Sequence, residues 1–242
     1  MPGSYWKLRD MNLSKAIECN RRVLLFVRYP EKGCVKTRLE THLSQDEIID
    51  LYQCFVADIL NTLQKSDYPV TICFLPCERE AEMKTWLGPT PAYAPQTGAD
   101  LGERMVNAFA QAFAAETSPV DQVILLGSDF PDLDSEIIHQ AFESLSNKDM
   151  TLGPAVDGGY YLIGFNYHTF SKEVFKDISW GTGQVFKETM RKIEHAGLNV
   201  HLLPEWRDID RFEDLELLYR QADDKGLEHL KTIQYLHTIL TR

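Results

Sequence analysis

The chain has 242 residues, which suits one large α/β domain, and 44% of them are hydrophobic, enough to bury a sizeable core. Its formal net charge of −11 argues against nucleic-acid and anionic-membrane partners, because phosphate surfaces attract an excess of Lys and Arg. The sequence shows no apolar run of membrane-spanning length and no signal peptide, so we expect a soluble, cytoplasmic protein. It also has no CxxC spacing, so we expect its cysteines to be reduced (Cys19, Cys34, Cys54, Cys73 and Cys77).

The first half of the chain alternates apolar strands with helices. Residues 23–27 form an unbroken apolar run, which is typical of a strand covered on both faces. Ser44 and Glu47 form a capping box before apolar residues at three- and four-residue steps, so a helix is predicted over 44–65. The next predicted elements are a strand, a short helix and a loop rich in Pro and Gly, at 70–75, 78–86 and 88–100.

The second half continues this alternation. Asp134 is expected to cap a helix that ends near residue 145, and Thr182 and Gly197 are expected to begin and end a later helix. The other elements are predicted, in chain order, at 101–114 (helix), 122–126, 150–154, 160–165 and 199–203 (strands), and 211–240 (a helical tail).

This order of elements predicts a three-layer α/β/α fold around a mainly parallel, mixed sheet. We expect a single domain over 1–242, with its core at about 22–218. In such sheets, ligands bind at the loops that follow the carboxyl ends of the strands, so polar residues at those places are the candidates for function.

The loop after the first strand is a basic island in an acidic chain. Arg28, Lys36 and Arg38 lie in it, and Gly33 permits an unusual backbone angle. Cations and backbone amides at such a turn suit phosphate oxygens. The alternative is a solvated, charged surface loop.

Carboxylates follow two other strands. Ser128 and Asp129 come directly after the strand at 122–126, where a carboxylate can hold Mg²⁺ or Mn²⁺ together with substrate phosphates. Asp208 and Asp210 follow the last strand, and residues two apart in an extended chain point the same way. Helix capping is the alternative for both groups.

The connection between the strands at 150–154 and 160–165 carries a further candidate site. Asp157 is at its apex, and Gly158 and Gly159 let the backbone approach a ligand closely. An ordinary β-turn is the alternative for Asp157, and strand packing is the alternative for Tyr160 and Tyr161.

Six motifs in this order closely resemble a family of bacterial nucleotide-diphospho-sugar transferases, often labelled radical-SAM-associated or arsenosugar-biosynthesis glycosyltransferases. The resemblance covers about residues 22–218. The motifs are FVRYPEKGCVKTRL, GADLGERM, LLGSDFPDLD, GPAVDGGYYLIG, ISWGT and LPEWRDIDRFEDL.

The resemblance implies a GT-A-like, Rossmann-like fold, related to the guanylyltransferases of molybdenum-cofactor and phospholactate biosynthesis. By the same resemblance, Asp129 would bind the metal ion, with Asp210 and Asp208 as candidates for the second carboxylate. The residues expected at the nucleotide and its phosphates are Arg28, Lys36, Arg38, Asp100, Glu103, Arg104 and Ser128. Those expected on the sugar or acceptor side are Asp157, Gly158, Gly159 and Tyr160.

The chain departs from the family pattern at Trp180-Gly181-Thr182, where such proteins usually have Trp-Ser-Thr. It also lacks the Gly-rich first loop of sugar nucleotidyltransferases, which favours transfer of a sugar over transfer of a nucleotide.

The sequence therefore predicts a glycosyltransferase that uses a nucleotide-sugar donor and Mg²⁺ or Mn²⁺, with Asp129, Asp157 and Lys36 as catalytic residues. Two alternatives stay open: a nucleotidyltransferase that releases pyrophosphate, and a non-catalytic binder of sugar nucleotides. The expected partners are a nucleotide-sugar or nucleoside triphosphate and a small-molecule acceptor. A homodimer is one option, since the sequence does not determine the oligomeric state.

Overall fold

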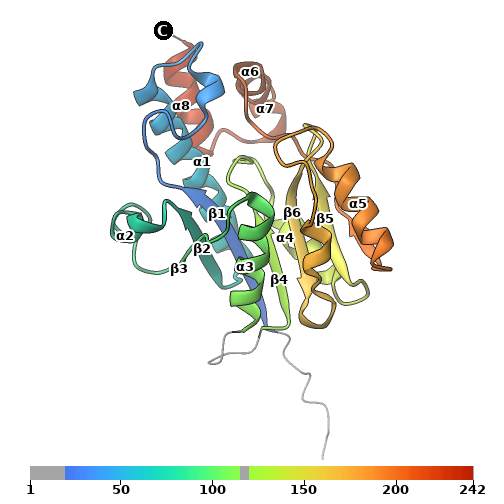
Figure 1. Cartoon of the computed structure of the whole chain (residues 1–242). Helices are drawn as coiled ribbons and strands as arrows, with labels where there is room; N and C mark the ends of the chain where they lie inside the picture. The colour runs from blue at the N-terminus through green and yellow to red at the C-terminus, as the bar shows by residue number, and fades with distance from the viewer. Residues whose placement is uncertain (1–19, 115–119, 242) are drawn as a thin grey trace, which may run out of the picture.

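The computed structural model describes residues 20–114 and 120–241. Within these ranges, seven strands form one sheet in the order β3-β2-β1-β4-β6-β5-β7 (Figure 1). The strands are β1 (Arg21–Arg28), β2 (Val70–Leu75), β3 (Ala92–Pro95), β4 (Gln122–Leu126), β5 (Met150–Pro154), β6 (Tyr160–Asn166) and β7 (Val200–Leu202). Cys19 lies outside the described residues.

Helices cover both faces of this sheet, as the alternation of elements predicts. The α-helices are α1 (Gln45–Ser66), α2 (Glu80–Leu87), α3 (Leu101–Phe113), α4 (Ser135–Ser144), α5 (Val185–His195), α6 (Phe212–Arg220), α7 (Ala222–Lys225) and α8 (Lys231–Leu240). Short 3-10 helices are η1 (Thr37–Leu39), η2 (Cys77–Arg79), η3 (Tyr167–Thr169) and η4 (Lys172–Phe175).

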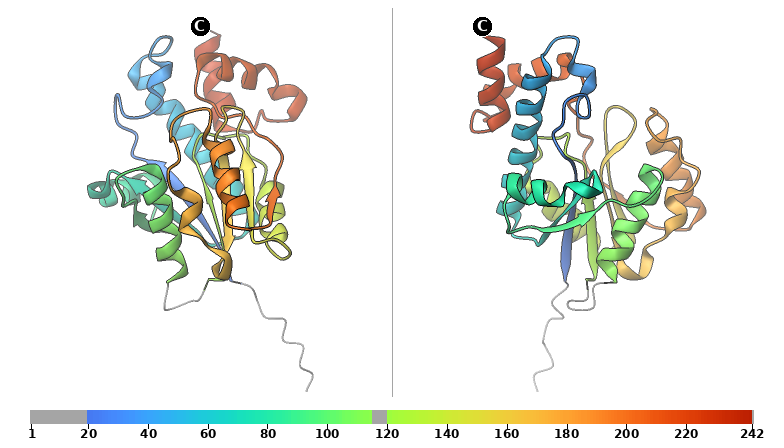
Figure 2. Two further views of the ribbon diagram at one scale, coloured as in Figure 1. Left: turned by 45° about the vertical axis from the view of Figure 1, so that its right-hand side comes forward. Right: turned by 60° about the vertical axis from the view of Figure 1, so that its left-hand side comes forward.

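Two apolar cores hold the layers together. Along β1, Val23 and Leu25 face the core built with α1 and α4, whereas Leu24 faces the core built with α3 and α5. This alternation is the period of two expected of a strand buried on both faces. Figure 2 shows α1 and α8 on one side of the sheet and α3 and α5 on the other. The predicted three-layer α/β/α fold is therefore confirmed.

The directions of the strands bring the predicted loops to one edge. β1 is parallel to β2 and β4, and β6 runs antiparallel between β4 and β5, which makes the sheet mixed. β7 is parallel to β5. The carboxyl ends of β1, β4, β5 and β7 consequently meet at the upper edge of the sheet in Figure 1.

Three details of the predicted elements were wrong. The loop predicted at 88–100 contains the edge strand β3, which is only four residues long and has no apolar run. The tail predicted as one helix over 211–240 is three helices: α6 and α7 are separated at Gln221, and Gly226 ends α7 in the left-handed conformation (φ 65°). Thr182 does not cap α5: the N-cap is Gln184, since residues 182–185 first form a turn.

No helix in residues 20–114 or 120–241 combines the length and the apolar character needed to cross a bilayer.

Candidate functional site

A cleft of about 920 Å³ lies over the carboxyl edge of the sheet. The loops after β1, β4, β5 and β7 all contribute to its lining, together with the start of α3 and the segment 180–183. Eleven of the predicted site residues line it: Arg28, Lys36, Arg38, Arg104, Ser128, Asp129, Asp157, Gly159, Tyr160, Asp208 and Asp210.

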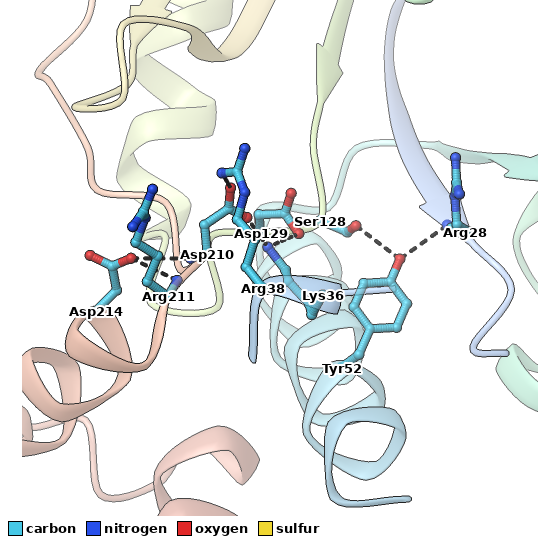
Figure 3. Close-up of polar contacts among 9 residues, drawn as sticks. All are labelled: Arg28, Lys36, Arg38, Tyr52, Ser128, Asp129, Asp210, Arg211 and Asp214. Carbon is cyan, nitrogen blue, oxygen red and sulfur yellow. Dashed lines mark hydrogen bonds and ion pairs between the residues drawn. The ribbon is translucent and has the colours of Figure 1, made fainter. Parts of the chain in front are cut away.

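Lys36 joins two of the predicted metal carboxylates (Figure 3). Its Nζ lies 2.6 Å from Asp129 Oδ1 and 2.8 Å from Asp210 Oδ1. Arg38 Nη1 contacts the other oxygen, Asp210 Oδ2, at 2.7 Å. The Lys36 side chain is only 5% exposed, whereas the side chains of Asp129 and Asp210 are 41% and 30% exposed, so a buried ammonium joins two carboxylates that stay accessible in the cleft.

Local backbone structure explains why these residues meet. Lys36 has a left-handed backbone (φ 45°, ψ 40°) directly before η1, and its carbonyl accepts a hydrogen bond from Leu39 N. Ile209 N donates to Asp129 O at 3.0 Å, which fastens the loop after β7 to the loop after β4. This hydrogen bond places Asp210 beside Asp129 although the two are 81 positions apart in the chain.

The alternative of helix capping does not describe Asp210. Its side chain binds Lys36 and Arg38, whereas the backbone amides of Asp210 and Arg211 donate to Asp214 at the start of α6. Asp134 does cap α4, as predicted, by accepting from Glu136 N at 2.9 Å.

Lys36 and Asp210 shift each other's pKa values. Burial by itself would lower the pKa of Lys36, but the carboxylates of Asp129 and Asp210 outweigh it, so the pKa is raised. Burial would raise the pKa of Asp210, but Lys36 and Arg38 lower it. Both groups are therefore ionised at neutral pH, and the ion pairs are held by full charges.

Asp208 has a different environment from Asp210. Burial, together with the nearby carboxylates of Asp157 and Asp210, raises the pKa of Asp208 to about 6. Asp208 makes no ion pair with Lys36 in the described part of the chain. The structure therefore distinguishes the two acids of the RDID motif, which the sequence left equivalent.

Tyr52 of α1 was missed by the sequence analysis, which placed it among the apolar residues of its helix. Its hydroxyl accepts from Arg28 N at 3.0 Å and shares a hydrogen bond with Ser128 Oγ at 3.1 Å. Burial raises the pKa of Tyr52 to about 12, so it stays protonated. Tyr52 thus fixes the loops after β1 and β4 relative to each other (Figure 3).

Arg28 and Arg104 form a positive corner of the cleft. Arg28 Nη1 donates to Cys34 O at 3.2 Å and Arg104 Nε to Asp100 O at 3.1 Å, and neither guanidinium has an acidic ion-pair partner among the described residues. Burial and the charge of Arg28 lower the pKa of Arg104. Two neighbouring cations that form no ion pair in the described part of the chain suit an anionic ligand.

The hairpin between β5 and β6 carries Asp157 to the cleft. Asp157 Oδ1 accepts from Gly159 N at 2.8 Å, so the residue also shapes the turn that the sequence offered as an alternative. Gly158 is not in the cleft lining but packs on Gly183, where an added Cβ would come within 2.4 Å of Gly183 O. Tyr160 lines the cleft and donates to Met105 Sδ at 3.8 Å.

Two residues expected near the nucleotide lie outside the cleft lining. Asp100 caps α3 by accepting from Glu103 N at 2.8 Å, and Glu103 accepts from Ala99 N. Both residues hold the start of α3, which carries Arg104. The cleft lining also includes Gln96, Trp180, Arg207 and Arg211, to which the sequence analysis assigned no role. Arg207 and Arg211 flank the acids of the RDID motif, a signal that could have identified them.

Asp129 and Asp210 are the carboxylates that could hold a divalent cation together with a ligand. Among the described residues, no three His, Cys, Asp or Glu side chains are grouped closely enough to hold a metal ion. Asp129 and Asp210 do share one cation, the Lys36 ammonium, between their oxygens. Mg²⁺ is usually bound by one or two carboxylates plus phosphates and waters, so this pair suits a metal–phosphate complex.

Comparison with known proteins agrees with the predicted resemblance. The family model DUF2064, described as an uncharacterized protein conserved in bacteria, matches residues 59–182. A "putative nucleotide-diphospho-sugar transferase" from Desulfovibrio desulfuricans G20 is 39% identical, with a TM-score of 0.87 over 92% of this chain and 96% of that chain. No curated protein matches the sequence.

More distant solved structures share the fold alone. A cytidylyltransferase from Leptospira borgpetersenii is 14% identical, with a TM-score of 0.52 over 92% of this chain and 96% of its own. CMP:2-keto-3-deoxy-manno-octonic acid synthetase, solved in complex with CTP, is 10% identical, with a TM-score of 0.52 over 85% and 99% of the two chains.

Proposed function

This chain belongs to the bacterial family DUF2064, and we propose that it is a metal-dependent glycosyltransferase that uses a nucleoside diphosphate sugar as donor. The predictions of the family resemblance and of the transferase class are confirmed by the 39% identical relative.

One observation carries the proposal: the Lys36 ammonium lies between Asp129 and Asp210 on the floor of the cleft. Three loops that are distant in the sequence converge there on one cation. Charged groups that are held in place before the reaction stabilise the charge that develops on a leaving diphosphate.

Cationic side chains are available for every part of the diphosphate. Lys36 and Arg38 would bind its oxygens next to the carboxylate pair, and Arg28 and Arg104 add two guanidinium groups elsewhere in the cleft lining. A divalent cation on Asp129 and Asp210 would neutralise the charge of the leaving group. Ser128, which is fixed by Tyr52, orients the loop that carries Asp129.

Asp157 is the residue proposed for the acceptor. It is exposed at the tip of the β5–β6 hairpin and lines the cleft. A carboxylate there can orient an acceptor hydroxyl and take its proton as the new glycosidic bond forms.

A nucleotidyltransferase is the second candidate, because the same cations and carboxylates suit a nucleoside triphosphate. The described loop after β1 carries one glycine, Gly33, and so lacks the Gly-rich phosphate loop. This favours the glycosyltransferase. Purely non-catalytic binding is less favoured, since the metal carboxylates and Asp157 line one cleft.

The test is an incubation of the purified protein with panels of nucleotide-sugars and of nucleoside triphosphates, with Mn²⁺ and with EDTA. We expect Mn²⁺-dependent release of a nucleoside diphosphate from at least one nucleotide-sugar. Release of pyrophosphate from a triphosphate instead would establish the second candidate. Tight binding without any product would contradict both catalytic assignments.

A further inference from the structure

Lys36 and Arg38 occupy three of the four carboxylate oxygens that the proposed metal site offers. Lys36 Nζ contacts Asp129 Oδ1 and Asp210 Oδ1, and Arg38 Nη1 contacts Asp210 Oδ2. Of these four oxygens only Asp129 Oδ2 has no partner among the described residues. A metal ion that enters this arrangement would find a single uncommitted oxygen.

A metal ion and the Lys36 ammonium exclude each other from this place. Mg²⁺ binds oxygens at about 2.1 Å, so an ion that uses both Oδ1 atoms would overlap with an ammonium 2.6 and 2.8 Å from the same atoms. The two positive charges would also repel each other at short range in a site where the Lys36 side chain is 5% exposed.

We propose that Lys36 closes the metal site of the nucleotide-free protein, and that a divalent cation gains Asp129 and Asp210 only when the diphosphate draws the Lys36 ammonium away. This inference rests on the function proposed above. It makes nucleotide and metal binding mutually dependent, with Lys36 as the element that couples them.

The side chain can make this exchange without a change in the main chain. Lys36 carries its charge on a flexible four-carbon stem, while its backbone is held at η1 by the hydrogen bond from Leu39 N. The residue lines the cleft, so its ammonium can turn from the carboxylates to a diphosphate bound above them. The phosphate oxygens replace the carboxylates as partners of the ammonium, which stays paired throughout.

Coupling of this kind is reciprocal. If the nucleotide raises the affinity for the metal ion by a given factor, the metal ion raises the affinity for the nucleotide by the same factor. Such factors are typically about 5- to 150-fold.

The test measures Mn²⁺ binding by electron paramagnetic resonance, with and without nucleoside diphosphates (UDP, GDP, CDP and ADP), and nucleotide binding by calorimetry. In the wild type, one of these nucleotides should tighten Mn²⁺ binding by at least roughly fivefold. Lys36→Met should bind Mn²⁺ alone more tightly than the wild type by a similar factor, yet bind the nucleotide more weakly. If Lys36 had a merely structural role, its replacement would weaken the binding of Mn²⁺ and the binding of the nucleotide alike.

Lys32→Met is the matched control, because Lys32 belongs to the same loop but pairs with Asp46 outside the cleft lining. It should leave both affinities unchanged. Arg38→Met frees only Asp210 Oδ2 and leaves Lys36 in place, so it should leave the affinity for Mn²⁺ alone near that of the wild type. If Lys36→Met fails to fold, Lys36→Gln answers the question, because it removes the charge but keeps a side chain that can donate hydrogen bonds to the carboxylates.

Equal Mn²⁺ affinity of the wild type with and without every nucleotide would overturn the gating role of Lys36 and leave the proposed site intact. Nucleotide binding without any Mn²⁺ binding, in wild type and variants alike, would instead remove the metal from the proposed function. Weaker Mn²⁺ binding in Lys36→Met would also overturn the inference.

Discussion

At the scale of single residues, Asp129 is the one on which the proposed chemistry depends most. It follows β4 directly, contacts Lys36, and through its carbonyl holds Ile209 and the loop that carries Asp210. Its side chain is 41% exposed, so a ligand can reach it.

Asp129→Asn should lower kcat/KM about 100-fold, since removing one preorganised charge contact costs roughly 3 kcal/mol of transition-state stabilisation. The fold should persist, because the main-chain carbonyl that binds Ile209 is retained. Steady-state kinetics with the best nucleotide-sugar measure the effect. Asp134→Asn is the control, as Asn caps a helix equally well and residue 134 is outside the cleft lining. An unchanged rate in Asp129→Asn would remove this residue from the site.

Asp132 provides a prediction about stability. Burial raises its pKa above 3.8, against the opposing effect of the hydrogen bond that Trp206 Nε1 donates at 2.9 Å. The folded state therefore binds more protons at this carboxyl than the unfolded state just above pH 3.8, so its contribution to the free energy of unfolding falls as the pH rises.

Asp132→Asn keeps an acceptor for Trp206 but cannot ionise. The variant should therefore gain stability relative to the wild type as the pH rises above 3.8, and the gain should level off once the native carboxyl is ionised. Urea unfolding at a series of pH values measures the difference. A difference that does not change with pH would show that the native carboxyl titrates normally.

The sequence predicted most acids and cations of the site because they follow apolar strands. It could not separate Asp208 from Asp210, because their difference comes from Lys36, which is more than 170 positions away. Tyr52 escaped the analysis for a similar reason: its ring fits the apolar face of α1, and only the folded chain shows that its hydroxyl joins two loops.

At the scale of elements, Tyr52 connects α1 to the loops after β1 and β4. Tyr52→Phe removes the partner of Arg28 N and of the buried Ser128 Oγ, so the free energy of unfolding should fall by about 1–3 kcal/mol. Denaturant unfolding measures this loss. Tyr219→Phe, which removes an exposed hydrogen bond to His237, should cost about 0.5 kcal/mol or less. Equal losses in the two variants would contradict the connecting role of Tyr52.

The β5–β6 hairpin is fastened to the segment before α5 by Gly158. A Cβ at this position would lie 2.4 Å from Gly183 O, and its φ of 88° is unfavourable for any other residue. Gly158→Ala should therefore lower both stability and kcat/KM, since it pushes Asp157 away from the cleft. Activity assays and thermal unfolding measure the two effects.

Gly197→Ala separates the strain of a positive φ from the clash with Gly183. Gly197 also has a positive φ (67°), but an added Cβ would have no neighbour within 4 Å. The free energy of unfolding of Gly197→Ala should fall by about 1 kcal/mol, which is the cost of the backbone conformation alone, and its kcat/KM should not change. If Gly158→Ala were as active as Gly197→Ala, the contact with Gly183 would not position Asp157.

Most helices and strands were predictable because they are long and regular in their apolar pattern. The exceptions are elements whose identity comes from their neighbours. β3 is a strand because β2 pairs with it, and its own sequence, AYAP, has no strand signal. The break in the C-terminal tail depends on Gly226 and on the anchoring of α8, where Asp58 of α1 accepts from Lys231 N and Thr232 N.

At the scale of the whole molecule, the order of strands and helices explains why distant loops form one cleft. An α/β alternation sends the carboxyl ends of parallel strands to the same edge, and this much follows from the sequence. The alternation does not determine the distances between the side chains of the cleft. These depend on single hydrogen bonds, such as the one that Ile209 N donates to Asp129 O. The chain as a whole is acidic, with a net charge of −11, whereas its cleft gathers five arginines and Lys36 beside five aspartates.

The most direct test of the account is a crystal structure with Mn²⁺ and a nucleoside diphosphate, in which anomalous scattering locates the metal ion. We predict one Mn²⁺ between Asp129 and Asp210, the diphosphate on that ion, and the Lys36 ammonium turned from the carboxylates to the phosphate oxygens. A diphosphate bound outside this cleft, or Mn²⁺ that contacts neither carboxylate, would contradict the account.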